Sequence, residues 1–276
     1  MTNNSDDQYK NNCVVLVSSY DGAHDLWQPF FTLFFRYWPD CPFPVYLISN
    51  YQRYEDQRVA SILIGKDKEW ATNIKRTLKQ IHTPYVICML DDFFLEKMTD
   101  TKYINSLIEF MQEKKIGYIS LFPTTAPTDG PFPSDLNLVE KSKGFNRVAL
   151  QAGLWDKNIL SGLLKDGENA WDMEIEGSIR SNNIEAPFLT VKEPVVYYNA
   201  RTAVIRGKWN YKVVKFCRRE GIKIDTKKRP IAYTVAIATF LDRTRKRSIS
   251  RKIRNFPVVG FVGIIIMKIV KRFLGK

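Results

Sequence analysis

The chain has 276 residues and a mass of 32.1 kDa, enough for one large domain or two small ones with a substantial core. A hydrophobic content of 45% and an aromatic content of 13% exclude a disordered or collagen-like chain. The net charge is +13, but residues 201–276 carry 22 − 3 = +19, which leaves 13 − 19 = −6 for residues 1–200. This split argues against a uniformly basic nucleic-acid binder. It is typical of a catalytic domain joined to an anchor for an anionic surface.

Targeting and redox signals are sparse. The four cysteines lie far apart and form no cluster of metal ligands, so we expect reduced thiols in a cytosolic setting. Residues 1–12 are polar and acidic, and we therefore expect no signal peptide. The longest apolar stretch, Phe256–Met267, has 12 residues, whereas a membrane-spanning helix needs about 20.

Strands and helices are predicted to alternate over the first 122 residues, because short buried apolar runs are separated by segments with helical spacing. The expected strands are Cys13–Val17, Pro44–Ser49, Val59–Ile64, Tyr85–Leu90 and Gly117–Phe122, and the expected helices are Leu26–Tyr37, Trp70–Ile81 and Thr101–Lys115. This pattern predicts an α/β domain with a mostly parallel sheet. Loops at the carboxyl ends of parallel strands meet at one edge, so we expect Ser18–Asp21, Ser49–Tyr51 and Asp91–Asp92 to share one cleft.

The second half of the chain is less regular. Residues 123–145 are rich in Pro, Gly, Ser and Thr and predict a long loop that could serve as an active-site flap. The elements expected after it are a strand at Asn146–Leu154, helices at Trp155–Leu164 and Trp171–Ser181, two short strands within Phe188–Tyr198, and a helix at Lys208–Gly221.

Asp91 and Asp92 are the sharpest chemical signal, because two adjacent carboxylates follow an apolar strand directly. Two anionic groups in a loop are costly unless a cation compensates them. A divalent ion bridging to a diphosphate would do so, since hard cations prefer carboxylate and phosphate oxygens. In the alternative reading, one aspartate caps a helix and the other faces solvent.

The run Thr83–Leu95 resembles the acidic-motif strand of nucleotide-sugar-dependent glycosyltransferases of the GT-A fold, in particular bacterial enzymes of capsule and O-antigen (lipopolysaccharide) biosynthesis. Val14–Asp21 is similar to their first strand and nucleotide loop. Leu150–Leu160 with Glu168–Ser178 is similar to their acceptor side, and Arg206–Trp209 to a basic-aromatic turn near the end of their catalytic domain. The usual motif is Asp-X-Asp, whereas Phe93 follows Asp92 here, so metal independence remains an alternative.

The resemblance implies a GT-A-like, Rossmann-like catalytic domain over residues 1–230, with a nucleotide-sugar half at about 12–122 and an acceptor half at about 146–230. It implies Mn²⁺ or Mg²⁺ at Asp91 and Asp92. The residues implied to bind the donor are Ser18, Ser19, Tyr20, Asp21, Asp91, Asp92, Arg206 and Lys208, and those implied to bind the acceptor are Gln151, Trp155 and Trp171.

The segment Trp171–Glu176 supplies three carboxylates beside an indole. On a helix, Asp172 and Glu176 share a face and Glu174 points elsewhere. Glu174 matches the general base that the resemblance implies and is the first choice, with Asp172 second; an inverting transfer needs such a base. Alternatively, these acids only oppose the helix dipole, Trp155 and Trp171 belong to the core, and Arg206 and Lys208 are a solvated basic surface.

Residues 231–276 are expected to form a basic, amphipathic helical tail. Residues 243–276 contain 11 Lys or Arg and no acid. Basic clusters flanking a short apolar segment favour association with an anionic membrane surface. Nucleic-acid binding, which we do not expect, and packing on another subunit are the alternatives.

Together these features predict a nucleotide-sugar glycosyltransferase that is cytoplasmic and peripheral on the inner face of the cell membrane. The acceptor would be a lipid-linked saccharide or an oligosaccharide. A sugar-phosphate nucleotidyltransferase on a related fold is one alternative, although Ser18–Asp25 lacks the Gly-rich basic loop usual in those enzymes. A non-enzymatic membrane or RNA adaptor is another.

Overall fold

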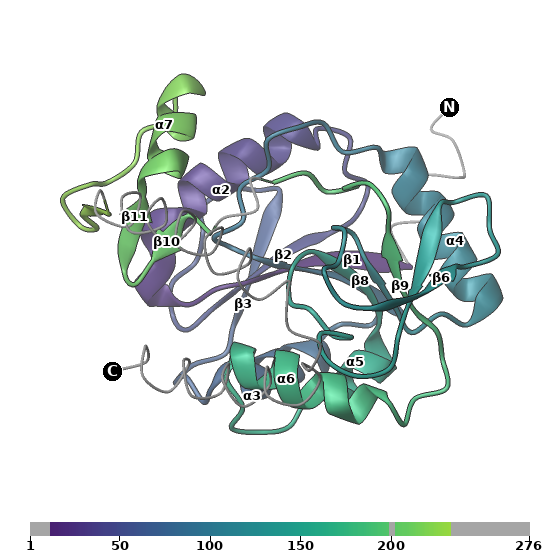
Figure 1. Ribbon diagram of the computed structural model, residues 1–276. Coiled ribbons are helices and arrows are strands. Elements are labelled where there is room, and N and C mark those ends of the chain that lie inside the picture. Colours follow the sequence, from purple (N-terminus) through teal and green to yellow (C-terminus); the bar gives the residue numbers. More distant parts are fainter. Residues whose placement is uncertain (1–11, 199–201, 233–276) are drawn as a thin grey trace, which may run out of the picture. The chain divides into compact units, whose positions relative to one another are not determined.

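A nine-stranded sheet in the order β3-β2-β1-β4-β8-β5-β9-β7-β6 is the centre of the computed structural model, which describes residues 12–198 and 202–232 (Figure 1). Its strands are β1 Cys13–Ser18, β2 Val45–Ser49, β3 Val59–Leu63, β4 Tyr85–Leu90, β5 Tyr118–Ser120, β6 Thr128–Pro131, β7 Leu138–Lys141, β8 Gly153–Asp156 and β9 Phe188–Val191.

Helices cover both faces of this sheet (Figure 1). The helices of the described residues are the 3-10 helix η1 Asp21–Ala23 and the α-helices α2 His24–Tyr37, α3 Trp70–Leu78, α4 Thr101–Lys114, α5 Lys157–Leu163, α6 Ala170–Ser181 and α7 Tyr211–Arg219. Helices α2 and α4 lie on one face, and α3, α5 and α6 lie together on the other. The sheet is therefore shielded from water on both sides, which is why β1 is a nearly continuous apolar run with five of its six residues buried.

Strand directions confirm the predicted α/β fold with a mostly parallel sheet flanked by helices. Strands β1, β2, β3 and β4 pair in parallel, and β5 pairs in parallel with β9. Strand β8 is antiparallel to its neighbours β4 and β5, and β7 is antiparallel to β9 and β6. Only β7 and β8 therefore run against the common direction.

Two predictions between residues 123 and 164 were wrong. The expected loop contains the hairpin β6–β7, which extends the sheet through antiparallel pairing of β7 with β9. The strand expected at Asn146–Leu154 instead begins at Gly153. The helix expected at Trp155–Leu164 is confirmed as α5 and begins two residues later. A Cβ on Gly153 would lie 2.6 Å from Cε2 of Tyr118, so only glycine allows β8 to lie this close to β5.

The chain divides into two units after Pro230. Before that point, the short strands β10 Val204–Ile205 and β11 Lys208–Asn210 form an antiparallel pair that leads into α7. The second unit contributes the strand β12 Ile231–Ala232 to the described residues. The predicted helical tail lies otherwise outside the described residues. Among those residues no helix has the length and apolar character needed to cross a membrane.

Candidate active site

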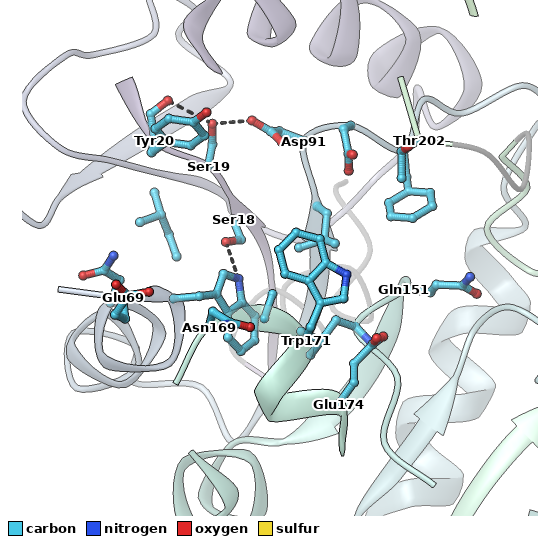
Figure 2. A pocket seen from close by; sticks show the side chains of 18 of the residues that line it. Ser18, Ser19, Tyr20, Glu69, Asp91, Gln151, Asn169, Trp171, Glu174 and Thr202 are labelled. Atoms are coloured by element: carbon cyan, nitrogen blue, oxygen red, sulfur yellow. Dashed lines mark hydrogen bonds between the residues drawn. The ribbon is translucent and has the colours of Figure 1, made fainter. Parts of the chain in front are cut away.

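The carboxyl ends of β1 and β4 open into a cavity of about 540 Å³ (Figure 2). The register pairs Ser18 with Leu90, and the backbone N–H of Asp91 donates to the Ser18 carbonyl at 3.3 Å. Ser18, Ser19 and Tyr20 therefore line the cavity beside Asp91 and Asp92. These five residues come together because parallel neighbouring strands end at the same edge.

Asp21 has a different place from the one expected. Its carboxylate accepts hydrogen bonds from the backbone N–H groups of Asn50 (2.8 Å), Tyr51 (3.1 Å) and Gln52 (3.3 Å). It does not line the cavity, and neither does the segment Ser49–Tyr51. Asp21 thus fastens the loop after β1 to the loop after β2.

Two tryptophans orient the serine hydroxyls. The indole N–H of Trp70 donates to Ser18 Oγ at 3.0 Å, and that of Trp27 donates to Ser19 Oγ at 2.6 Å. Ser19 Oγ then donates to Asp91 Oδ2 (Figure 2). The relay from Trp27 through Ser19 fixes the orientation of the Asp91 carboxyl group.

Asp91 and Asp92 both resist ionisation. Burial, together with the negative charge of Asp92, raises the pKa of Asp91 to about 8. Burial also raises the pKa of Asp92 to about 6. Across residues 12–198 and 202–232, neither carboxylate forms an ion pair. The site therefore favours binding either a proton or a cation that compensates these groups.

The opposite wall of the cavity begins at the amino end of α6. Asn169 and Asp172 form a capping box, in which Asn169 Oδ1 accepts from the Asp172 N–H at 2.9 Å and the Asp172 carboxylate accepts from the Asn169 N–H at 3.4 Å. Asp172 does not line the cavity, and it caps the first turn of α6, which agrees with the alternative that its charge opposes the helix dipole. Glu174 does line it, and its Oε1 accepts from the Leu150 N–H at 2.8 Å.

The two acceptor-side tryptophans have opposite environments. The side chain of Trp171 is 71% exposed and extends from α6 between Asp91 and Glu174 (Figure 2). Trp155 is 1% exposed and stacks on Tyr118 with a centroid separation of 3.9 Å. Trp155 therefore belongs to the core and is removed from the acceptor residues. Gln151 lines the cavity as expected of an acceptor residue.

Arg206 and Lys208 are exposed on the β10–β11 hairpin and do not line the cavity. Arg206 and Gly207 have φ angles of +49° and +74°, which identifies them as turn residues. Thr202, from the same segment, lines the cavity instead. The basic residue whose charge acts on Asp91 is Arg229, which pairs with Asp25 through two hydrogen bonds of 2.9 and 3.0 Å.

Sequence reasoning missed one group of residues that line the cavity. They follow β3 and are Asp67, Glu69, Trp70 and Asn73. Asp67 Oδ1 accepts from Asn73 Nδ2 at 2.6 Å and from the Glu69 N–H at 3.0 Å. The available signal was that β3 is a parallel neighbour of β2, so its exit loop faces the same edge of the sheet.

No family model and no curated protein matches the sequence. The fold is similar to that of a mannosyltransferase from Pyrobaculum calidifontis solved with GDP-mannose and Mn²⁺, at a TM-score of 0.48 and 12% identity over 76% of this chain and 61% of that one. It is also similar to S. aureus TarS 1–349, at a TM-score of 0.39 and 13% identity over 65% and 60%. For TarS 1–349 with UDP-GlcNAc the values are 0.43 and 11% over 65% and 58%.

This chain therefore spans about three fifths of the length of the solved proteins that it matches. Similarity at this level does not identify an activity.

Proposed function

We propose that this protein transfers a sugar from a nucleotide-sugar donor to a saccharide acceptor. The observation that carries this proposal is the pair of half-buried carboxylates, Asp91 and Asp92, at a strand end across one cavity from the carboxylate of Glu174. A diphosphate beside the aspartates and an acceptor beside Glu174 and Trp171 would place the reacting groups between the two walls.

The donor diphosphate is proposed to lie against the ends of β1 and β4, near Ser18, Ser19, Asp91 and Asp92. The residues present fit a divalent cation in one respect: both carboxylates line the cavity and have pKa values raised by partial burial, so a cation would stabilise their ionised forms. Among the described residues no group of three His, Cys, Asp or Glu side chains could hold a metal. Asp91 and Asp92 would therefore hold Mn²⁺ or Mg²⁺ together with donor phosphate oxygens. When bound, the ion supplies positive charge beside the diphosphate.

Glu174 is proposed as the general base. As the acceptor hydroxyl oxygen forms its bond to the anomeric carbon, the hydroxyl proton passes to Glu174. The bond between that carbon and the diphosphate oxygen breaks, and its electron pair leaves with the nucleoside diphosphate. Because Glu174 lies on the wall opposite the aspartates, we propose attack from the face opposite the leaving group, with inversion of configuration.

We also propose a type of acceptor, a biosynthetic process and a cellular location for this protein. The lipid-linked or oligosaccharide acceptor and the place in capsule or O-antigen synthesis derive from the resemblance of Thr83–Leu95. The peripheral position on the cytoplasmic face of the membrane derives from the basic charge of residues 243–276.

The donor class is tested by thermal unfolding of the full chain with nucleotide sugars, in the presence and absence of Mn²⁺. A ligand that binds only the native state raises the melting temperature, so we expect at least one nucleotide sugar to do so. The variant Asp91→Asn/Asp92→Asn should lose the part of the shift that depends on Mn²⁺. Stabilisation by nucleoside triphosphates with sugar phosphates, and by no nucleotide sugar, would instead indicate a nucleotidyltransferase.

The base is tested by Glu174→Gln. The glutamine Oε1 can still accept from the Leu150 N–H, so the variant should fold as the parent protein does. Loss of the proton acceptor should lower the transfer rate by about 10²–10⁴-fold. Asp172→Asn, which keeps an acceptor for the capping box but lies off the cavity, is the matched control and should retain transfer. Unchanged turnover in Glu174→Gln would remove this residue from the mechanism.

A further inference from the structure

A second hollow, of about 490 Å³, lies on the outer face of α3 and is lined mainly by cations. Its lining residues are Lys68, Thr72, Lys75, Arg76, Lys79 and Asp166. The helix has two distinct sides: Ala71, Ile74 and Leu78 are buried in the core, and the residues one position further along face this hollow. We call this hollow the basic groove.

The charge of the basic groove is poorly compensated. Four cations and one acid give a net charge of 4 − 1 = +3. Lys75 pairs with Asp166 at 3.5 Å, and this acid is 66% exposed. Within residues 12–198 and 202–232 the other three cations form no ion pair. Lys75 and Arg76 also oppose the dipole at the end of α3, but this does not explain Lys68, which precedes the helix.

The basic groove and the active-site cavity are lined by neighbouring residues of one segment, 67–73. Asp67 and Glu69 line the cavity while Lys68 lines the groove, and Asn73 lines the cavity while its neighbour Thr72 lines the groove. Thr72 Oγ1 accepts from the Gly167 N–H at 2.9 Å, and the Ala71 N–H donates to the Glu168 carbonyl at 3.0 Å. These bonds join α3 to the loop before α6, so the same two segments border the groove and the cavity.

We infer that the basic groove binds a phosphate group of the acceptor, which identifies the acceptor as a phosphate-bearing saccharide. Arg76 offers a planar, bidentate donor and the lysines offer point charges, a combination suited to phosphate oxygens. A concave site of this size fits a discrete anionic group better than the flat surface of a membrane. The inference rests on the proposed function, because it assumes that the donor occupies the neighbouring cavity.

The test compares two variants of the full chain that lose the same charges. Lys75→Ala/Arg76→Ala/Lys79→Ala removes three cations of the groove. Lys212→Ala/Lys215→Ala/Arg218→Ala removes two lysines and one arginine that are exposed on α7. The probe is inorganic pyrophosphate in EDTA, measured by calorimetry, because EDTA removes the divalent ions through which Asp91 and Asp92 would hold a diphosphate. We expect the groove variant to bind pyrophosphate at least 10-fold more weakly and the α7 variant to bind it as the parent does.

Two further measurements identify the source of the phosphate. Nucleotide-sugar stabilisation with Mn²⁺ should be unchanged in the groove variant; its loss would mean that the groove holds the donor and would overturn the inference. Flotation with phosphatidylglycerol/phosphatidylcholine vesicles should also be unchanged; a loss specific to the groove variant, with pyrophosphate affinity retained, would assign the groove to the membrane instead.

The inference can fail independently of the proposed function. If both triple variants bind pyrophosphate equally, the groove is a solvated basic surface, whatever the nucleotide sugars do. Lys79→Glu alone, at an exposed position, gives a milder variant if the triple substitution unfolds, and it should weaken pyrophosphate binding in the same direction.

Discussion

At the scale of single residues, the two aspartates of the cavity, Asp91 and Asp92, are only partly exposed to water, and this disfavours their ionised forms. The raised pKa values of Asp91 and Asp92 arise mainly from burial. In the ligand-free protein this costs stability as the pH rises, because the folded state holds protons that the unfolded chain releases near pH 4. A site that binds a diphosphate with a cation would recover that free energy on binding.

Lys141 is a second buried charge, and sequence patterns gave no sign of it. Its side chain is 1% exposed, and its Nζ lies 5.2 Å from the ring centroid of Tyr118, with no hydrogen-bond partner among the described residues. Burial lowers the pKa of this amine to about 7, although the negative charge of Glu174 acts in the opposite direction. The ammonium therefore costs free energy of folding at neutral pH.

Replacing this lysine should stabilise the protein in a pH-dependent way. Between about pH 7 and the usual lysine pKa of about 10.4, the unfolded state binds more protons than the folded state, so the parent gains stability as the pH rises. Lys141→Met removes this slope and should raise the free energy of unfolding by about 1–3 kcal/mol at or below pH 7. The gain should shrink toward pH 10, as measured by urea denaturation.

Lys143→Met is the control for Lys141→Met, since Lys143 is exposed two residues further along the chain. It should change the free energy of unfolding by less than about 0.5 kcal/mol at every pH. A Lys141→Met variant that is less stable at pH 6–7, and keeps the parental slope, would show that the ammonium is stabilised in the fold.

At the scale of elements, predictions succeeded where a single periodicity decides the structure. Strands β1 and β4 are short apolar runs ended by polar residues, and α2 has buried residues spaced along one face. The hairpin β6–β7 could not be predicted in this way. Its first strand, Thr-Asp-Gly-Pro, has no apolar alternation, and it forms a strand because β7 completes the sheet beside β9.

The candidate site was also predictable only where strand ends or helical spacing decide the position of a residue. The strand-end rule places Ser18, Ser19, Tyr20, Asp91 and Asp92 around one cavity. The helical spacing at α6 correctly separated Glu174 from Asp172, because only Glu174 lines the cavity. Two facts depend on long-range packing. The sequence left open whether Trp155 belongs to the core, and its stacking on Tyr118 decides this. The contacts of Trp27 and Trp70 with the serine hydroxyls could not be predicted.

Replacing the two tryptophans that the sequence assigned to the acceptor, Trp171 and Trp155, should have opposite effects on stability and binding. Trp171→Ala on α6 should leave the free energy of unfolding within about 0.5 kcal/mol of the parent, because the side chain is 71% exposed. Its loss should raise the KM for acceptor, since an aromatic face in the cavity offers a platform for a sugar ring. Trp155→Ala on β8 should instead cost about 3–5 kcal/mol of stability.

Kinetic assays and urea denaturation of both variants distinguish these roles. If Trp171→Ala kept the parental KM, the indole would not contact the acceptor, although the assignments of Asp91 and Glu174 would be unaffected.

At the scale of the whole molecule, negative net charge lies in the first 200 residues of the chain and positive net charge in the rest. Residues 1–200 carry −6 and residues 201–276 carry +19. The described part of the basic portion includes α7, on which Lys212, Lys215 and Arg218 are exposed. Arg201 and the basic residues from 243 onward lie outside the described residues, and the proposed contact with an anionic membrane belongs to the residues from 243 onward.

That contact predicts a graded loss of membrane binding when charge is removed from the full chain. Each basic residue near an anionic leaflet contributes about 1 kcal/mol, so neutralising Arg243, Arg245, Lys246 and Arg247 to glutamine should weaken binding by about 4 kcal/mol, or roughly 10³-fold. Flotation with phosphatidylglycerol-containing vesicles measures this loss, and high salt should reduce the parent's binding in the same way.

Lys212→Ala/Lys215→Ala/Arg218→Ala serves as the control for nonspecific charge and should still float. Equal loss in both variants would mean that net charge alone drives association, and a shift of RNA in gels that is lost with the same four residues would assign the segment to nucleic acid.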